Sequence, residues 1–298
     1  MQQAIIKSRA LIEAMDYIRK FKGRIVVIKF GGSIMDDPDA IKNILRDVVF
    51  MQSVGMHPVL VHGGGKAISH AMEERGLEVQ FVQGRRYTDQ RTLTVVEHVL
   101  CNEVNRQIVE TLETFGVDAV GLHTLDSGVL FGERLYLEDE GRKIDLGFVG
   151  KVNRVNGHLI EAVCHAGTIP VLASLAADPS GQRLNCNADT AAGEVAHSMQ
   201  AEKFVVLSDT HGIRTDIEDP DSNIPEITAA EIRALIADGT IAGGMLPKVE
   251  ACLRALDGGV KRTHIIDGRF PHSLLLEIFT HKGIGTQINK DSLAPGKA

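Results

Sequence analysis

Apolar positions recur along this chain in two patterns, one typical of amphipathic helices and the other of buried strands. Short apolar runs predict strands over 25–30, 57–62, 168–173, 203–207, 262–266 and 284–288. Helical periodicity predicts helices over 2–22, 38–54, 66–75, 89–115, 157–165, 189–199, 228–238, 247–257 and 272–280. This alternation predicts an α/β fold, a three-layer sandwich in which helices cover both faces of a mostly parallel central sheet.

Two segments depart from the alternation. Residues 77–88 are predicted to be irregular, and residues 118–155 are predicted to form a β-rich insertion. Turn residues suggest hairpins at 126–128 and 140–141 within that insertion.

Composition narrows the class of protein. The chain has 298 residues, 44% of them hydrophobic, which is enough for one large domain or two lobes that share a sheet. Its net charge of −7 disfavours nucleic-acid and membrane-surface partners, and it contains no apolar run long enough for a spanning helix. Charged residues throughout positions 1–22 argue against a signal peptide, and the four cysteines are scattered. We therefore expect a cytoplasmic protein with free thiols and no metal-ligating residues.

Two predicted strands run directly into clusters of glycine. The first carries Lys29 and ends in Gly31-Gly32-Ser33, and the second ends in His62 followed by Gly63-Gly64-Gly65. Glycines between a strand and a helix let backbone N–H groups approach an anion, and the helix N-terminus adds partial positive charge. A lysine within an apolar strand is costly unless it is paired or functional. The pattern indicates a site for a highly anionic group, such as a transferring phosphoryl group.

The common nucleotide-binding motifs are missing. Gly65-Lys66 is followed by Ala67, which breaks the GxxxxGK[ST] pattern, and no GxGxxG follows the first strand. A P-loop or dinucleotide-binding fold therefore has little support.

Further polar residues stand where predicted strands end or helices begin. They are Arg86, Asn185, Asn187, Asp189, Ser208, Asp209, Gly212 and Lys248. Ligands of open parallel sheets bind beyond the carboxyl ends of the strands, so those that follow 25–30, 57–62 and 203–207 should share one edge. Structural interpretations also exist: Asp189 could be a helix N-cap, Lys248 a solvated lysine, Arg86 part of a surface pair and His62 a hydrogen-bonded core histidine.

Taken together, these residues resemble the amino acid kinase family, and within it the members that act on N-acetyl-L-glutamate. The resemblance extends from about residue 24 to 288. It is carried by 27–33, 61–65, 84–89, 185–189, 243–250 and 264–268. Two departures stand out: Lys66 replaces a usual proline, and the string at 208–212 is Ser-Asp-Thr-His-Gly rather than Thr-Asp-Val-Pro-Gly.

The resemblance implies ATP-dependent phosphorylation of the γ-carboxylate of N-acetyl-L-glutamate, the second step of arginine biosynthesis, with Mg²⁺. It implies a lobe at 23–184 for the acyl amino acid and a lobe at 185–298 for ATP. Lys29, Lys248 and Asp189 would be catalytic. Substrate would contact Gly64, Gly65, Arg86, Asn185 and Asn187. Nucleotide would contact Gly31, Gly32, Ser208, Asp209 and Gly212.

The helix expected at 1–22 resembles that of arginine-inhibited members. The resemblance implies a homo-oligomer, either a dimer or a hexamer built as a trimer of dimers, with arginine as inhibitor. The effector residues would be Tyr17, Lys203, His264, Glu277 and Gly285.

Two alternative functions remain at this level. One is a sibling kinase for acetylaminoadipate or a related acid, because one methylene changes binding by only about 1–3 kcal/mol. The other is a non-catalytic regulatory binding protein on the same fold. Retention of Lys29, Lys248 and Asp189 favours the enzyme.

Overall fold

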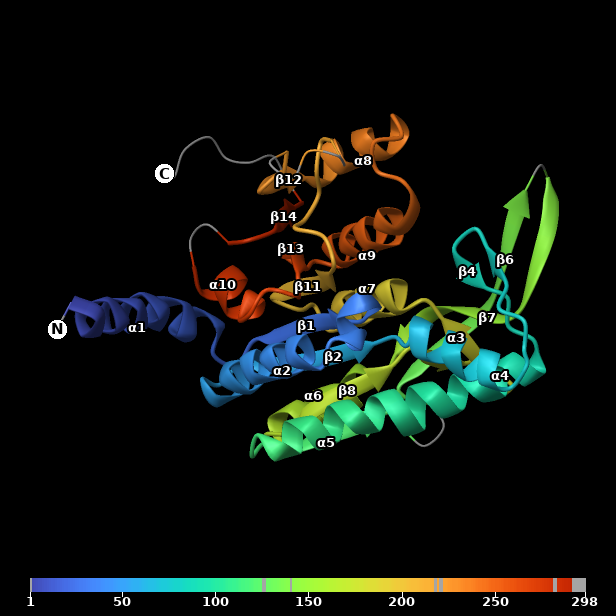
Figure 1. Cartoon of the computed structure of the whole chain (residues 1–298), viewed down its shortest axis with the longest axis horizontal. Helices are drawn as coiled ribbons and strands as arrows, with labels where there is room; N and C mark the ends of the chain where they lie inside the picture. Colours follow the sequence, from blue (N-terminus) through green and yellow to red (C-terminus); the bar gives the residue numbers. More distant parts are fainter. Residues whose placement is uncertain are drawn as a thin grey trace.

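An eight-stranded sheet forms the middle layer of the molecule (Figure 1). From edge to edge its strands are β12 (Glu226–Thr228), β14 (Thr286–Asn289), β13 (Arg262–Asp267), β11 (Lys203–Ser208), β1 (Ile25–Phe30), β2 (His57–His62), β8 (Ile169–Ala173) and β5 (Ala119–Leu122). Every neighbouring pair is parallel except β13 and β14. The predicted α/β class with a mostly parallel central sheet is confirmed.

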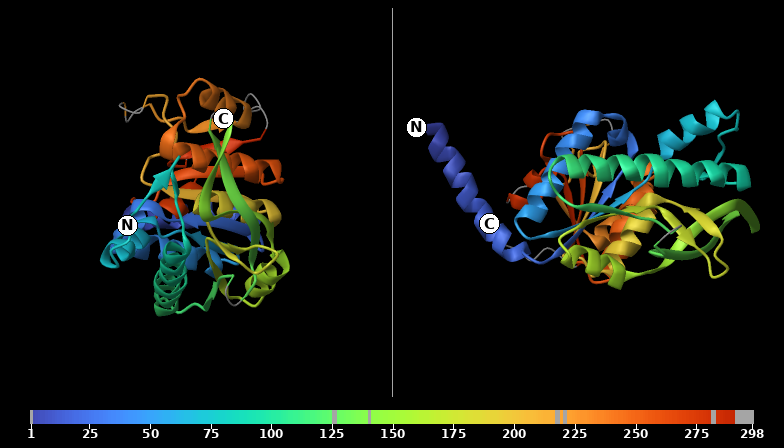
Figure 2. Two further views of the ribbon diagram at one scale, coloured as in Figure 1. Left: turned by 90° about the vertical axis from the view of Figure 1, so that its right-hand side faces the viewer. Right: turned by 90° about the horizontal axis from the view of Figure 1, so that it is seen from below.

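The computed structural model describes residues 2–124, 127–139, 141–216, 219, 222–280 and 283–290. The helices on one face are α2 (Pro38–Ser53), α3 (Gly65–Glu74), α4 (Gln90–Glu97), η2 (His98–Asn105), α5 (Arg106–Thr114) and α10 (Ser273–Phe279). The helices on the other are α6 (Gly157–His165), α7 (Ala188–Ser198), α8 (Ala229–Ala237) and α9 (Leu246–Asp257). The views in Figure 2 show these two layers on either side of the sheet. Helix α1 (Gln2–Phe21) projects from the body of the molecule.

The predicted strands at 25–30 and 57–62 are confirmed as β1 and β2. Both are buried on both faces: Val26 and Ile28 belong to one core and Val27 to the other. Local capping explains several helix starts. The Asp37 side chain accepts hydrogen bonds from two backbone amides of α2, and Thr228 with Glu231 forms a capping box on α8.

The β-rich insertion is confirmed only in part. β6 (Leu130–Asp139) and β7 (Arg142–Val155) form the hairpin expected at 140–141, although Glu140 itself lies outside the described residues. The hairpin expected at 126–128 is wrong. β5 before this turn pairs with β8 in the main sheet, because its alternative partner β6 is taken by β7. Asp126 lies outside the described residues.

Five short strands escaped the sequence-based prediction, and one of them is the edge strand β12. β9 (Leu175–Ala177) and β10 (Arg183–Cys186) join β6 and β7 in a small closed barrel. β3 (Phe81–Val82) and β4 (Arg85–Arg86) form a hairpin in the segment expected to be irregular. Strands of two to four residues carry too little hydrophobic pattern to be recognised.

The single helix predicted at 89–115 contains a π-helical turn. This turn, η2, ends at Asn105, whose side-chain amide donates to the carbonyl of Val171 and contacts His62 Nε2 at 2.9 Å. A Cβ on Gly121 would collide with the Asn105 side chain. The wider turn thus carries a buried polar residue that ties this helix to β2, β5 and β8.

All four cysteines are buried thiols outside any disulfide, as expected. Within the described part of the chain, no helix combines the length and the apolar character needed to cross a bilayer.

Candidate functional site

A cavity of about 540 Å³ opens at the carboxyl edge of the parallel strands. It brings together twelve of the residues named from the sequence, which are Lys29, Gly31, Gly32, Gly64, Gly65, Arg86, Asn185, Asn187, Asp189, Ser208, Asp209 and Lys248. The residues that follow 25–30, 57–62 and 203–207 all line this cavity, so the shared edge predicted for them is confirmed.

Lys29 and Asp189 form the charged centre of the cavity. Lys29 lies in β1 and is 5% exposed, and its Nζ is 2.9 Å from Oδ1 of Asp189. The ammonium lies off the hydrogen-bonding direction, so the contact is an ion pair, and Oδ1 accepts no aligned hydrogen bond from any described residue. Asp189 is the second residue of α7, and it points to the lysine rather than capping its own helix. The interpretation of Asp189 as a simple N-cap is therefore wrong.

Asn187 is the residue that caps α7. Its Oδ1 accepts hydrogen bonds from the backbone amides of Asp189 and Thr190 at 3.0 and 3.1 Å. Asn185, two residues earlier, donates from Nδ2 to Thr88 Oγ1 at 3.0 Å. Both asparagines line the cavity, and capping by Asn187 leaves Asp189 available to Lys29.

The two glycine clusters leave room for a ligand in different ways. A Cβ on Gly31 would lie 3.3–3.4 Å from Cε and Nζ of Lys29, and Gly32 has a φ of +74° that favours glycine. A Cβ on Gly64 would lie 2.9 Å from Leu100, whereas one on Gly65 would meet no described atom within 4 Å. Gly31 therefore accommodates the lysine, and Gly65 borders open space.

Arg86 brings a second buried cation to the cavity. It is 7% exposed, and its guanidinium donates to the Gly65 carbonyl at 2.7 Å and to Ser69 Oγ at 2.8 Å. The ring of Phe81 lies 4.8 Å from it. Burial lowers the pKa of Arg86, but a guanidinium stays protonated at neutral pH. Among the described residues no carboxylate pairs with Arg86, so its charge is available to an anionic ligand.

Lys248 reaches the cavity from the start of α9. Its Nζ donates to the carbonyl of Gly244 at 2.7 Å in the preceding turn, so the contact with Asp189 implied by the resemblance is not made in this structure. A Cβ on Gly244 would meet no described atom within 4 Å. A long flexible side chain held by one backbone carbonyl can turn towards a ligand.

The residues after β11 divide into two groups. Ser208 and Asp209 line the cavity, and Ser208 Oγ contacts Thr210 Oγ1 at 3.3 Å. Gly212 is absent from the described lining and packs against Thr286, where a Cβ would lie 2.4 Å from the hydroxyl. In this structure Gly212 shapes the loop rather than the cavity wall.

His62 is a structural histidine, in line with the alternative drawn from its sequence. It is completely buried, and its ring nitrogens contact the Gly63 carbonyl and Asn105. Burial lowers its pKa to about 4, so the ring is neutral at physiological pH.

A second cavity of about 470 Å³ lies between α1 and α10. Its charged lining residues are Glu13, Asp16, Lys20, Lys203, Glu226, Arg262 and Glu277. Tyr17 also lines it, with its ring 6.5 Å from that of Phe279. Of the proposed effector residues, Tyr17, Lys203 and Glu277 are in the wall, while His264 and Gly285 make direct contacts with Glu277.

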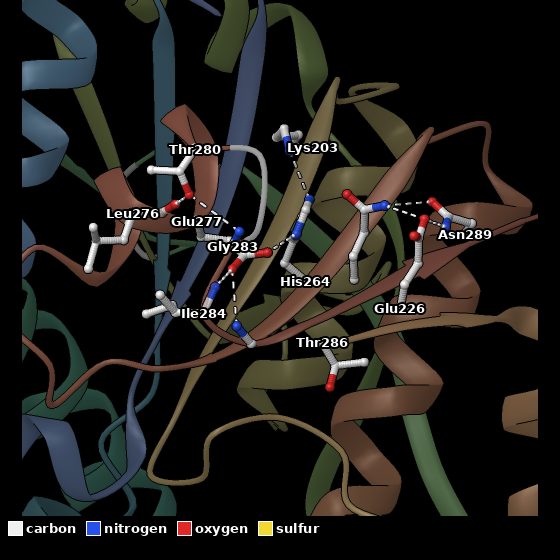
Figure 3. Close-up of polar contacts among 12 residues, drawn as sticks. Lys203, Glu226, His264, Leu276, Glu277, Thr280, Gly283, Ile284, Thr286 and Asn289 are labelled. Carbon is white, nitrogen blue, oxygen red and sulfur yellow. Dashed lines mark hydrogen bonds and ion pairs between the residues drawn. The ribbon is translucent and has the colours of Figure 1, made fainter. Parts of the chain in front are cut away.

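Lys203, His264 and Glu277 form a buried chain of contacts (Figure 3). Lys203 Nζ is 3.0 Å from His264 Nε2, and His264 Nδ1 is 2.6 Å from Glu277 Oε1. Desolvation by burial and the neighbouring Lys203 lower the pKa of His264 to about 4. A neutral ring therefore accepts from the lysine at Nε2 and donates from Nδ1 to the carboxylate.

The other carboxylate oxygen of Glu277 anchors the turn before β14. Oε2 accepts hydrogen bonds from the backbone amides of Ile284 and Gly285 at 2.7 and 3.2 Å. Burial opposes ionisation of Glu277, but its bonds to His264 and to these amides lower its pKa to about 2. A Cβ on Gly285 would lie 2.3 Å from the Ile265 carbonyl, so glycine is needed there.

Reasoning from the sequence did not identify several residues that line the two cavities. Ser69 and Ser174 line the first cavity, and Arg262 and Glu226 line the second. Arg262 had a usable signal, because it precedes His264 by two positions in a strand and so shares its face. Glu226 belongs to a three-residue strand that the pattern does not reveal.

Comparison with known proteins gives consistent matches. Residues 24–267 match the model of the amino acid kinase family. The chain is 47% identical to the acetylglutamate kinase of Symbiobacterium thermophilum over 97% of this chain and 99% of that one. It is 48% identical to the acetylglutamate kinase of Synechococcus elongatus over 94% and 91%. An N-acetylglutamate synthase from Neisseria gonorrhoeae, solved with coenzyme A and N-acetyl-glutamate, superposes with a TM-score of 0.83 at 26% identity over 96% of this chain and 64% of that one.

Proposed function

Because the chain belongs to the amino acid kinase family and has acetylglutamate kinase activity in arginine biosynthesis, we propose that the first cavity aligns N-acetyl-L-glutamate with ATP for phosphoryl transfer. The observation that carries this assignment is the Lys29–Asp189 ion pair between two glycine turns. The products are N-acetyl-L-glutamyl 5-phosphate and ADP.

Arg86 holds the α-carboxylate of the acyl amino acid. Its guanidinium is buried in the cavity wall and has no carboxylate partner among the described residues. Asn185 and Asn187 line the same wall and supply polar contacts, and Gly64 and Gly65 let the substrate approach the backbone. The γ-carboxylate, with a reference pKa of about 4.3, is already ionised at neutral pH and needs no general base.

Catalysis then consists of alignment and charge neutralisation. Lys29 contacts the transferring phosphoryl group from the first glycine turn, and Lys248 turns from the Gly244 carbonyl to contact it from the other side. Asp189 orients both lysines, and the amides of Gly32, Gly64 and Gly65 donate to the equatorial oxygens. One such donor is typically worth about 10²–10³ in rate.

ATP lies along Gly31, Gly32, Ser208 and Asp209, with Gly212 shaping the loop that follows. Mg²⁺ enters as the MgATP complex. The described residues contain no cluster of three metal-ligating side chains, which suits an ion held mainly by phosphate oxygens and water.

A coupled ADP-release assay tests this function. We expect turnover with N-acetyl-L-glutamate and weak or no turnover with acetylaminoadipate, aspartate and carbamate. Preference for acetylaminoadipate would establish the sibling kinase, and absence of ADP release with every acid would establish a binding protein.

We also propose that arginine inhibits the enzyme by binding in the second cavity. Glu13, Asp16 and Glu277 can accept from a guanidinium and an ammonium group, while Lys20, Lys203 and Arg262 can hold a carboxylate. If millimolar arginine leaves both the intact enzyme and a variant lacking residues 1–22 unaffected, this assignment fails.

Helix α1 is the proposed assembly element. It carries exposed Ile5, Ile12 and Met15 on a segment that projects from the body. We propose that two such helices cover one another and link dimers into a hexamer, with residues 23–184 as the substrate lobe and 185–298 as the nucleotide lobe. Light scattering of the intact chain and of a chain without residues 1–22 measures the assembly directly.

A further inference from the structure

Lys66 is a charged residue of the first cavity that the proposed mechanism does not use. It directly follows Gly65 in the first turn of α3 and lines the cavity together with Lys29 and Gly32. Its Nζ lies 2.6 Å from Oδ2 of Asp36. The side chain therefore reaches towards Asp36, and it stays 67% exposed to solvent.

The Lys66–Asp36 pair connects the two glycine turns. Asp36 is the last residue of η1 (Gly32–Asp36), which follows the first turn, and Lys66 is the second residue of α3, which follows the second. A phosphate bound between the turns would lie near this pair. The orientation of Lys66 towards η1 also separates it from Arg86, which reaches Gly65 and Ser69 on α3.

The pair is built to open at little cost. The two side chains are 67% and 45% exposed, and ion pairs with this exposure contribute roughly 0–1 kcal/mol. Asp36 offers one negative charge, whereas the terminal phosphate of ATP carries more. A flexible lysine can exchange the weaker partner for the stronger one without disturbing the fold.

We propose that Lys66 is an additional phosphate-binding residue, which leaves Asp36 and contacts the terminal phosphate of ATP when the nucleotide binds. This role rests on the proposed position of the transferring phosphate between the two glycine turns. It predicts that Asp36 competes with ATP for Lys66 in the empty enzyme.

Steady-state kinetics on Lys66→Met, Lys66→Arg, Asp36→Asn and the double variant Lys66→Met/Asp36→Asn test this proposal. We expect Lys66→Met to raise KM for MgATP about fivefold, the equivalent of about 1 kcal/mol, with KM for N-acetyl-L-glutamate unchanged. Lys66→Arg should keep KM for MgATP close to the wild-type value. Asp36→Asn should lower KM for MgATP when Lys66 is present and have no effect when it is Met.

Three outcomes would overturn the proposal. The first is an unchanged KM for MgATP in Lys66→Met, and the second is a rise in KM for the acyl amino acid instead. The third is an equal rise in KM for MgATP in Lys66→Met and Asp36→Asn, which would show that the ion pair only stabilises the structure. Lys29→Met, assayed in parallel, separates this test from the mechanism itself. Full turnover in Lys29→Met would refute the proposed site, whatever Lys66 does.

Discussion

Two buried lysines on neighbouring strands line the two cavities, one in each. Lys29 in β1 and Lys203 in β11 are each 5% exposed, and the two strands pair in parallel with Val26 opposite Lys203. Lys29 pairs directly with the carboxylate of Asp189. Lys203 contacts the neutral ring of His264, which separates it from Glu277. The same residue type on the same sheet is therefore used in two different ways.

Position in the strand explains the difference. Lys29 lies near the carboxyl end of β1, where glycine turns and helix N-termini supply backbone amides that favour phosphate. Lys203 begins β11 at the opposite end, where the walls are side chains of both charges. Side chains alternate along a strand, so the two lysines also lie on opposite faces of the sheet. Lys29 shares a face with Val27, and Lys203 shares a face with Val205.

The largest expected effect separates the two lysines by activity. Lys29→Met should lower kcat by about 10²–10³, because the ammonium stabilises charge in the transition state. Lys203→Met is the matched control and should keep kcat within about twofold. Steady-state assays with circular dichroism to verify folding make this comparison, and equal losses in both variants would contradict it.

The second prediction concerns pH and the Lys203 region. The pKa of His264 is lowered from 6.5 to about 4, so the folded state binds this proton less readily than the unfolded chain. The stabilisation that comes from a neutral His264 in the folded state is complete above pH 6.5, and it is lost as pH falls towards 4. By pH 5 the loss is about 2 kcal/mol, and Glu277, with a pKa of about 2, adds a further loss below pH 4.5.

Thermal unfolding between pH 7 and 5 measures this loss. His264→Asn should show a shallower fall in Tm than the wild type, because it removes the titrating group. An equally steep fall in both proteins would assign the acid sensitivity elsewhere.

The third prediction concerns regulation. Lys203→Met should raise the arginine concentration for half-inhibition about tenfold, the loss of one charged contact. Lys20→Met changes an exposed lysine in the last turn of α1, offers a control on the same wall and should shift inhibition less. Inhibition curves at fixed substrate concentrations compare the two, and an unshifted curve for Lys203→Met would remove this lysine from the effector site.

The smallest expected effect concerns Gly31. A methyl group there would lie 3.3–3.4 Å from the end of Lys29, so the flexible lysine must shift by a few tenths of an ångström. Gly31→Ala should lower kcat about threefold and leave Tm and arginine inhibition unchanged. Rates and melting curves check both parts, and a large loss of stability would show that the methyl group disturbs the backbone instead.

Much of the first cavity could be predicted from the sequence. The strands 25–30 and 57–62 were clear, because each is a short apolar run that ends in glycines. The contact between Lys29 and Asp189, which 160 residues separate, was implied only by the resemblance to a family. The rule that ligands bind at the carboxyl edge did predict correctly that the residues following 25–30, 57–62 and 203–207 would share one edge. That inference needs only strand direction, which alternating helices impose.

The second cavity could not be predicted from the sequence in the same way. Nothing in the local pattern links Lys203, His264 and Glu277, and only the resemblance to a family named them together. Their contact depends on β11 lying beside β13 and on α10 folding back over both, which are decided by packing between distant segments.

By itself, the sequence determined the alternation of strands and helices, the two glycine turns and the buried lysine just before the first of them, because these follow from local pattern and from the cost of burying a charge. Only the tertiary structure decided that Asn187 rather than Asp189 caps α7, that β5 joins the main sheet and that Lys66 reaches Asp36. In each case, several partners were available to the residue or strand. Such a choice is made by the geometry of the assembled sheet and helices, which no short stretch of sequence contains.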